Sequence, residues 1–273
     1  MMKKWILRLI LIVLGLPLLL AIILAAAYLL ANRTNGKLEV SGETRRYLLY
    51  VPESYDPAVP TPLVITIHGF AEWPAHQMQI THWNELADRQ GFIVVYPSGT
   101  DFPRHWRAYG APGSESDPAL EVSFISALID RLSSEYNIDP TRVYANGLSN
   151  GGGMSFTLAC MLSERIAAVG LVSGAYLLPW EQCNPERPVP VIAFHGSADP
   201  IVPYQGGPSD RFDQPFPAIP EWVEVLARHN GCLGEALALP TIGDVSGVQY
   251  TDCAADPSLS APALTQSGSG LSP

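Results

Sequence analysis

Charged residues make up only 15% of this 273-residue chain, and cysteines number four. A disordered chain or a coiled coil needs a much larger charged fraction, and a small disulfide scaffold needs many more cysteines. Basic residues are also in the minority, because 16 Lys and Arg stand against 26 Asp and Glu. Proteins that bind nucleic acid neutralise phosphates with Lys and Arg, so a nucleic-acid partner is not expected.

No acidic residue occurs in residues 1–37, and no charged residue of either sign occurs from Leu9 to Ala31. As a helix, this stretch would be roughly 34 Å long, enough to cross a bilayer. The basic flank predicts a cytoplasmic N-terminus, with residues 1–31 as a signal anchor and the rest exported. A cleaved signal peptide is the alternative, since Ala25, Ala26 and Ala27 are small enough to precede a cleavage site. Either interpretation predicts an extracellular or periplasmic domain, secreted or anchored.

The cysteines fit an oxidising compartment as two disulfides. Cys160, Cys183, Cys232 and Cys253 form no CxxC pair, and no cluster of His and Cys indicates a metal. Four cysteines allow three pairings. Proximity in sequence favours Cys160 with Cys183 and Cys232 with Cys253, while buried free thiols are the alternative for one or more of them. We expect neither a metal nor another cofactor.

Six short apolar runs alternate with helical patterns between a linker at 32–38 and Cys253. The runs are nearly continuous and partly β-branched, which is typical of strands covered on both faces of a parallel sheet. They are residues 46–51, 63–67, 92–96, 142–145, 167–172 and 189–194, and helices are expected near 76–89, over 122–136, after Asn150 and over 219–229. The alternation predicts one doubly wound, mostly parallel α/β domain over 39–253.

A GxSxG sequence, Gly147 to Gly151, lies between a predicted strand and a predicted helix. In that context it predicts a nucleophile elbow, whose glycines make room for a sharp turn that holds a serine hydroxyl at a helix N-terminus. Ser149 is therefore the candidate nucleophile. The backbone N–H of Asn150 is a candidate donor to an oxyanion. An ordinary glycine-rich turn is the alternative interpretation of the bare motif.

Two further candidates follow predicted strands. The segment His68-Gly69-Phe70 comes directly after the run 63–67. Hydrolases with a nucleophile elbow keep in this place the loop that supplies the second oxyanion amide, so Phe70 is the candidate donor. Only the backbone of Phe70 would act, and His68 is expected to be structural. Asp199 follows the run 189–194, which in the order serine, acid, histidine is the place of the acid. An Asp in a turn before proline is the alternative.

Four segments combine into a recognisable pattern: Gly147–Met154 with Leu158–Cys160, Gly91–Thr100, Tyr136–Pro140 and His195–Tyr204. Together they resemble the extracellular polyhydroxybutyrate depolymerase and feruloyl esterase family of α/β-hydrolases, from about Glu39 to Cys253. The resemblance implies an α/β-hydrolase fold. It also implies hydrolysis of carboxylic esters without a metal or cofactor, either polyester oligomers or the feruloyl and acetyl groups of polysaccharides. Gly153 stands where such proteins often carry methionine.

The resemblance also implies a histidine base in a Gly-Gly-His-x-Trp-Pro stretch beyond Cys253, but no histidine follows His229. Residues 254–273 are rich in Ser, Pro and Gly, which predicts a disordered or frameshifted tail and a domain without its last strand and helix. We interpret the chain first as a serine esterase with a truncated or frameshifted C-terminus and weak or no activity. The alternatives are a catalytically inactive relative that binds such esters and a serine peptidase on the same fold.

The expected partners are an ester substrate and, if the N-terminal helix is retained, a membrane. An acidic surface disfavours anionic polymers by charge repulsion. Tryptophans are candidates for an aromatic cleft that would bind feruloyl groups or a flat polymer surface, with core packing as the alternative. They are Trp73, Trp83, Trp106, Trp180 and Trp222.

Overall fold

The computed structural model describes residues 2–110, 116–209, 212–254 and 263–266. The strands of the main sheet are β1 (Gly36–Val40), β2 (Glu43–Tyr50), β3 (Thr61–Ile67), β4 (Ile93–Pro97), β5 (Ile138–Leu148), β6 (Ala168–Val172), β7 (Val191–Gly196), β10 (Leu237–Ile242), β11 (Val245–Gln249) and β12 (Ala263–Gln266). A separate hairpin contains β8 (Gly207–Ser209) and β9 (Phe212–Phe216). The helices are α1 (Met2–Ala31), α2 (Pro74–Thr81), α3 (Trp83–Gln90), α4 (Pro118–Glu135), α5 (Asn150–Met161), the short 3₁₀ helix η1 (Trp180–Gln182) and α6 (Ile219–His229).

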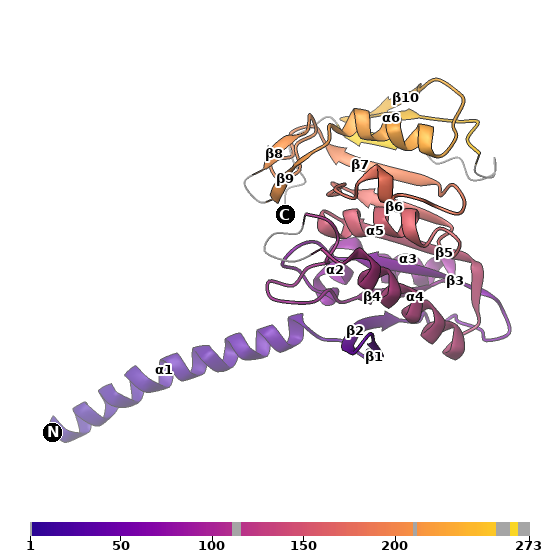
Figure 1. The fold of residues 1–273 in the computed structure, drawn as a ribbon. Helices are drawn as coiled ribbons and strands as arrows, with labels where there is room; N and C mark the ends of the chain where they lie inside the picture. The colour runs from indigo at the N-terminus through magenta and orange to yellow at the C-terminus, as the bar shows by residue number, and fades with distance from the viewer. Residues whose placement is uncertain (1, 111–115, 210–211, 255–262, 267–273) are drawn as a thin grey trace.

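The main sheet has the order β1-β2-β4-β3-β5-β6-β7-β12-β11-β10 (Figure 1). Its central strands, from β4 to β12 in that order, are parallel, and antiparallel strands form both edges. This arrangement confirms the predicted α/β-hydrolase fold, with a mostly parallel sheet and helices packed against it.

Two buried clusters hold the sheet, one on each face. Alternate residues of β3 point to opposite faces, so Leu63, Ile65 and Ile67 join one cluster and Val64 joins the other. The first cluster takes its helical side chains from α4, α5 and α6, and the second takes them from α2 and α3. The near-continuous apolar runs of the sequence are therefore strands covered on both sides.

The helix predicted near 76–89 is divided into α2 and α3. His82 adopts a left-handed conformation between them, with φ of 53°, and Gly91 ends α3 with φ of 71°. A single left-handed residue interrupts the ladder of helical hydrogen bonds, so the chain turns at His82. The first predicted strand also differs, because β2 pairs antiparallel with both β1 and β4.

The sequence pattern predicts no strand beyond α6. The sequence predicts no strand after Cys253, whereas β12 lies parallel to β7 and pairs Leu264 with Phe194 and Thr265 with His195. Four residues are too few for a periodic pattern, so pairing with β7 and β11 on either side forms this strand rather than local propensity. Residues 255–262 and 267–273 of the predicted tail lie outside the described residues.

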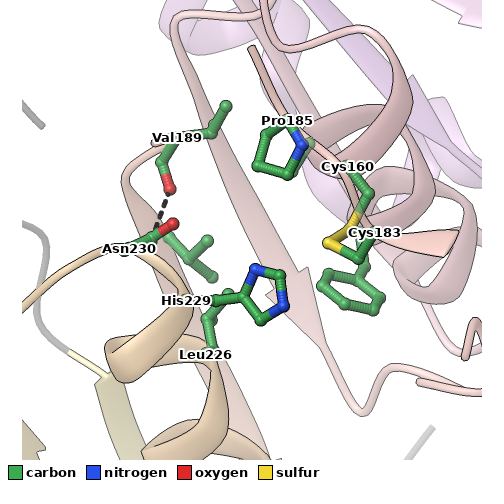
Figure 2. A pocket seen from close by; sticks show the side chains of 10 residues that line it. Cys160, Cys183, Pro185, Val189, Leu226, His229 and Asn230 are labelled. Atoms are coloured by element: carbon green, nitrogen blue, oxygen red, sulfur yellow. Dashed lines mark hydrogen bonds between the residues drawn. A yellow bond between two sulfur atoms is a disulfide. The ribbon is translucent and has the colours of Figure 1, made fainter. Parts of the chain in front are cut away.

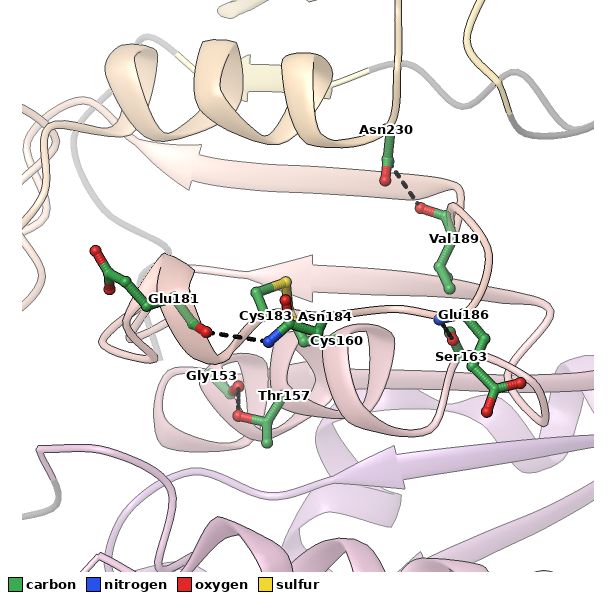
Figure 3. The surroundings of a disulfide bond; sticks show 10 residues. All are labelled: Gly153, Thr157, Cys160, Ser163, Glu181, Cys183, Asn184, Glu186, Val189 and Asn230. Carbon is green, nitrogen blue, oxygen red and sulfur yellow. Dashed lines mark hydrogen bonds between the residues drawn. A yellow bond between two sulfur atoms is a disulfide. The ribbon is translucent and has the colours of Figure 1, made fainter.

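Both disulfides favoured by sequence proximity are present. Cys160 of α5 joins Cys183, which directly follows η1, with their Cα atoms 4.5 Å apart (Figure 3). Cys232 joins Cys253, with Cα atoms 3.6 Å apart, and so ties the segment after α6 to the segment after β11. Hydrogen bonds from Asn184 to the Glu181 carbonyl and from the Glu186 N–H to Ser163 hold the chain around the first disulfide.

Candidate active site

The strand order places a topological switch point at the carboxyl ends of β3 and β5. The chain runs from β3 to β4 on one side and then returns to form β5 on the other side of β3. Open α/β sheets bind ligands at such a point, because the flanking connections leave in opposite directions. The segment His68–Phe70 leaves β3 here, and Ser149 leaves β5 here.

Ser149 occupies the sharp turn between β5 and α5. Its backbone angles are φ 55° and ψ −118°, and its side chain makes no capping hydrogen bond to the helix. The turn is held by three main-chain hydrogen bonds: the Ser149 N–H donates to Val172 at 2.9 Å, and its carbonyl accepts from Gly153 and Ala175 at 3.0 Å each. Left-handed backbone is costly for a residue with a side chain, so these bonds keep Ser149 in a strained elbow.

The glycines around Ser149 are required by close backbone contacts. A Cβ atom on Gly151 would overlap the carbonyl oxygen of Ile67 at the end of β3. A Cβ atom on Gly153 would overlap the carbonyl oxygen of Ala175. The start of α5 can therefore lie against the ends of the neighbouring strands only because it lacks side chains there.

His68 is a fully buried structural residue. Its Nδ1 atom lies 2.7 Å from the Gly69 carbonyl oxygen, and its Nε2 atom accepts a hydrogen bond from the Gly99 N–H at 3.0 Å. These partners require a neutral ring with the proton on Nδ1. Burial, partly opposed by the hydrogen bond to Gly69, lowers the pKa of His68 to about 3. His68 therefore holds the loop without taking part in proton transfer near neutral pH.

The hydrogen bond from His68 orients the next peptide group. In a trans peptide the C=O and N–H point in opposite directions, so the Phe70 N–H points away from the His68 ring. The amides on either side are occupied, because the Gly69 N–H donates to Glu72 at 3.0 Å and the Ala71 N–H donates to the Arg104 carbonyl at 2.7 Å. The Phe70 N–H has no acceptor among the residues that the structure describes, which suits a donor to a substrate oxygen.

Trp106 connects the two predicted oxyanion donors. The buried side chain of Asn150 accepts from the Trp106 N–H at 2.8 Å and donates to the Trp106 carbonyl at 3.3 Å. The Trp106 indole N–H donates to the His68 carbonyl at 3.0 Å. The Asn150 N–H itself lies in the first turn of α5, where helical N–H groups have no partner within the helix. The sequence does not predict a positioning role for Trp106. Its partners His68 and Asn150 are 38 and 44 positions away along the chain, and no local pattern links residues so far apart.

Asp199 lies three residues beyond β7, at the same edge of the sheet as Ser149. One carboxylate oxygen accepts from the N–H groups of Ile201 and Val202, each at 2.9 Å. These bonds hold the carboxylate in a turn before Pro200, as expected if Asp199 is only a turn residue. The second carboxylate oxygen lies 3.8 Å from Nε2 of His195. One strand, β6, separates the two residues' strands, so β5 and β7 are about 10 Å apart.

The described histidines are engaged away from Ser149. His195 is buried and its Nε2 lies 2.8 Å from the Val202 carbonyl, to which it donates; burial lowers its pKa. His229 stacks on Trp180 at 5.0 Å and lines a small pocket beside the Cys160–Cys183 disulfide (Figure 2). No histidine in the described ranges forms a hydrogen bond with both Ser149 and Asp199.

The tryptophans divide between the core and the surface. Trp106 and Trp222 are buried, and Trp222 stacks on Tyr176 with ring centroids 3.7 Å apart. The core interpretation therefore holds for these two, and a cleft lined by all five is wrong. Trp73, Trp83 and Trp180 are half-buried, and Trp73 directly precedes α2 beside the Phe70 loop.

The arrangement contains a serine in an elbow, two candidate amide donors and a fixed carboxylate, which are some of the groups used in acyl transfer; the described residues place no histidine base between them. Within the described parts of the chain, no group of three or more His, Cys, Asp and Glu side chains is placed to hold a metal ion.

Comparison with known proteins gives consistent matches. The model of a family described as esterase PHB depolymerase matches residues 45–182. A bifunctional acetylxylan esterase/xylanase of Neocallimastix patriciarum is 34% identical over 164 residues, which are 60% of this chain and only 23% of that protein. Feruloyl esterase C of Emericella nidulans is 28% identical over 225 residues, 79% of this chain and 72% of that protein. The solved structure of an acetyl xylan esterase from Aspergillus awamori shares the fold with a TM-score of 0.59 at 17% identity, covering 88% of this chain and 90% of that one.

Proposed function

Because the chain belongs to the PHB depolymerase family of esterases, we propose that it is a carboxylic ester hydrolase with Ser149 as nucleophile. The observation that carries the proposal is the strained conformation of Ser149 between β5 and α5. Such strain at a single residue, held by hydrogen bonds to two neighbouring segments, is typical of a functional site. The elbow stands at the switch point in strand order, where open α/β sheets generally bind ligands.

The proposed reaction proceeds in two acyl transfers. The Ser149 hydroxyl oxygen bonds to the carbonyl carbon of the ester, and the negative charge that develops on the carbonyl oxygen is stabilised by the N–H groups of Phe70 and Asn150. Collapse of this intermediate breaks the bond between the carbonyl carbon and the alkoxy oxygen, and an acyl-serine remains. The serine proton is lost to water, and the leaving alkoxide takes a proton from water to become the alcohol. Water then attacks the acyl-serine and releases the acid. The loss of one oxyanion donor typically lowers turnover by about 100- to 1,000-fold.

Proton transfer is the limiting part of the proposal. Asp199 has the place of an acid that would orient a histidine, but no histidine follows His229 in this sequence. A serine hydroxyl has a high pKa and reacts slowly without a base. Loss of the base lowers turnover by roughly a million-fold in the subtilisin example, leaving the contribution of the oxyanion hole and binding. We therefore expect slow hydrolysis by this chain.

The proposed substrates are acyl esters of polysaccharides, with polyhydroxyalkanoate-type polyesters as the alternative. Acetylxylan and feruloyl esters are the substrates in the names of two relatives. The half-buried Trp73 beside the Phe70 loop offers an apolar surface for a feruloyl ring. Two disulfides and an apolar N-terminal helix support export of the domain, where such polymers occur.

Hydrolysis of p-nitrophenyl acetate by the purified full chain tests the proposal. We expect a slow rate above buffer that Ser149→Ala removes, while Ser134→Ala on the surface of α4 leaves it unchanged. A rate that survives Ser149→Ala would contradict a serine mechanism. The alternative is an inactive relative that binds esters, which the missing histidine favours. It predicts no hydrolysis above the buffer rate, together with binding of a feruloylated oligosaccharide measured by calorimetry.

A further inference from the structure

α1 has an apolar surface that the described residues of the chain leave uncovered. Its window Val13–Leu30 has a mean hydropathy of 2.6 and no buried residue. Thirty residues of helix extend about 45 Å, which exceeds the hydrocarbon thickness of a bilayer. Trp5 and Tyr28 are exposed near its two ends, where aromatic residues of membrane helices meet the interface. A helix that is apolar on all sides needs a lipid or protein environment, and a bilayer fits this length.

The end of α1 is fixed to the domain by side-chain hydrogen bonds. The Asn32 side-chain oxygen, one residue beyond α1, accepts from a guanidinium N–H of Arg104 at 3.1 Å. Asn35 pairs with the main chain of Leu49 on β2, donating at 2.8 Å and accepting at 2.7 Å. Two attachments within four residues restrict how the domain can turn about the helix end.

Arg104 also reaches the candidate active site. Its carbonyl oxygen accepts from the N–H of Ala71, the residue after Phe70. Arg104 belongs to a tight hairpin closed by reciprocal main-chain bonds between Thr100 and His105, at 2.9 and 3.0 Å. The site and the end of α1 therefore lie on the same side of the domain. Figure 1 agrees, because α1 extends on the side toward which the arrows of β6 and β7 point.

Exposed aromatic and basic side chains lie beside the end of α1, and the exposed Asp101 next to Phe102 is paired with Arg107 at 3.1 Å. Phe102 at the tip of the Thr100–His105 hairpin is 90% exposed. Arg33 and Arg46 are exposed close to this hairpin. Arg33 directly follows Asn32, which bonds to Arg104. Arg46 is linked to Arg104 through Ser98, whose N–H donates to the Arg46 carbonyl and whose hydroxyl accepts from Arg104. These arginines stand out because the chain after residue 37 carries 11 basic and 26 acidic residues. Exposed aromatic and basic side chains together favour contact with anionic headgroups.

We propose that Arg33, Arg46, Phe102 and Arg104 lie on the headgroup region of an anionic bilayer that α1 spans. The carboxyl ends of β3 and β5, where Ser149 lies, then face the membrane surface. One consequence of this orientation rests on the proposed function: the esters that the enzyme cleaves would be those presented at the bilayer. The orientation itself depends on the anchor and the surface, and it is tested without any measurement of hydrolysis.

The test uses fluorescence quenching in vesicles of phosphatidylcholine and phosphatidylglycerol. The native cysteines described are all in disulfides, so a single introduced cysteine carries a nitrobenzoxadiazole label. Phe102→Cys is compared with Leu233→Cys, because both native residues are 90% exposed. Leu233 lies three residues beyond Asn230, whose side chain donates to the Val189 carbonyl just before β7 begins. The control position is therefore near the amino ends of the parallel strands, whereas Phe102 is near their carboxyl ends.

Headgroup-proximal doxyl lipids are expected to quench the label at position 102 at least threefold more than the label at 233, equally in a Ser149→Ala background. Replacing phosphatidylglycerol by phosphatidylcholine, or introducing Arg33→Glu with Arg46→Glu, is expected to reduce that quenching. Equal quenching at the two positions would overturn the proposal. A processed protein that begins after Ala27, seen by intact mass, would overturn it too. Absence of ester hydrolysis with quenching confined to position 102 would contradict the proposed function alone.

Discussion

The side chain of Asn150 bonds to both main-chain polar groups of Trp106, accepting from its N–H at 2.8 Å and donating to its carbonyl at 3.3 Å. The same residue supplies the N–H that we assign to the oxyanion. The start of α5 is thus fixed to the 99–110 loop, and Trp106 in turn bonds to the carbonyl of His68. The two amide donors are held at a fixed separation by one shared tryptophan.

Replacing Asn150 by leucine tests this link. The change keeps the backbone N–H but leaves the buried N–H and carbonyl of Trp106 without partners, which costs about 1–3 kcal/mol for each group left unsatisfied. We expect the urea midpoint to fall and the rate of p-nitrophenyl acetate hydrolysis to fall at least tenfold. Asn184→Leu, at an exposed asparagine, is the matched control. Equal effects of the two substitutions would contradict a positioning role for Asn150.

Stability is expected to fall in acid because of His68. Its pKa is about 3 in the folded protein and about 6.5 when unfolded, so below pH 6.5 the unfolded chain binds a proton that the folded chain does not. Each pH unit between about 6.5 and 3 then lowers the free energy of unfolding by about 1.4 kcal/mol from this residue. His195 acts in the same direction, because burial lowers its pKa as well.

Urea unfolding of the wild type and His68→Gln at several pH values between 7 and 4.5 measures this contribution. Glutamine keeps a donor and an acceptor but does not titrate in this range. The slope of unfolding free energy against pH should be smaller in His68→Gln, whereas His82→Gln, at an exposed histidine, should match the wild type. Parallel slopes in all three proteins would refute the assignment.

Gly153→Ala is expected to destabilise the elbow. The added methyl group would overlap the Ala175 carbonyl oxygen, and the Ala175 N–H donates to Ser149. Overpacking of this kind costs about 1–3 kcal/mol. Gly234→Ala is the control, because its methyl group would stand 3.5 Å from the Thr251 carbonyl, an ordinary contact. A Gly153→Ala protein as stable and active as the Gly234→Ala protein would show that the segment after β6 can move aside.

The two disulfides allow a matched comparison of their contributions. They close loops of similar length, with sequence separations of 23 and 21 residues, so each should contribute about 3 kcal/mol by restricting the unfolded chain. Cys160 and Cys183 are also buried in the core, unlike the second pair. We expect Cys160→Ala with Cys183→Ala to lower the melting temperature more than Cys232→Ala with Cys253→Ala. The reverse order would mean that core packing around the first pair adapts to the loss.

The sequence predicts the parts of the fold that are encoded locally. Apolar runs locate β2 to β7 because buried strands need them, and amphipathic spacing locates α4. The break at His82 comes from a single left-handed residue, and the strands after α6 depend on tertiary pairing, so the periodic patterns predict neither. The same division holds at the site. GxSxG and chain order give Ser149 and Asp199 as candidates, whereas the links from Trp106 and Arg104 to the oxyanion loop join residues far apart in sequence.

The parallel pairing of β12 with β7 offers a route to protein engineering. Parallel neighbours end at the same edge of a sheet, and Gln266 at the end of β12 pairs with Gly196, three residues before Asp199. A loop grafted after Gln266 would therefore start beside the candidate acid. A designed segment that carries a histidine there would start close to Asp199, so the scaffold is a starting point for engineering an imidazole between Asp199 and Ser149.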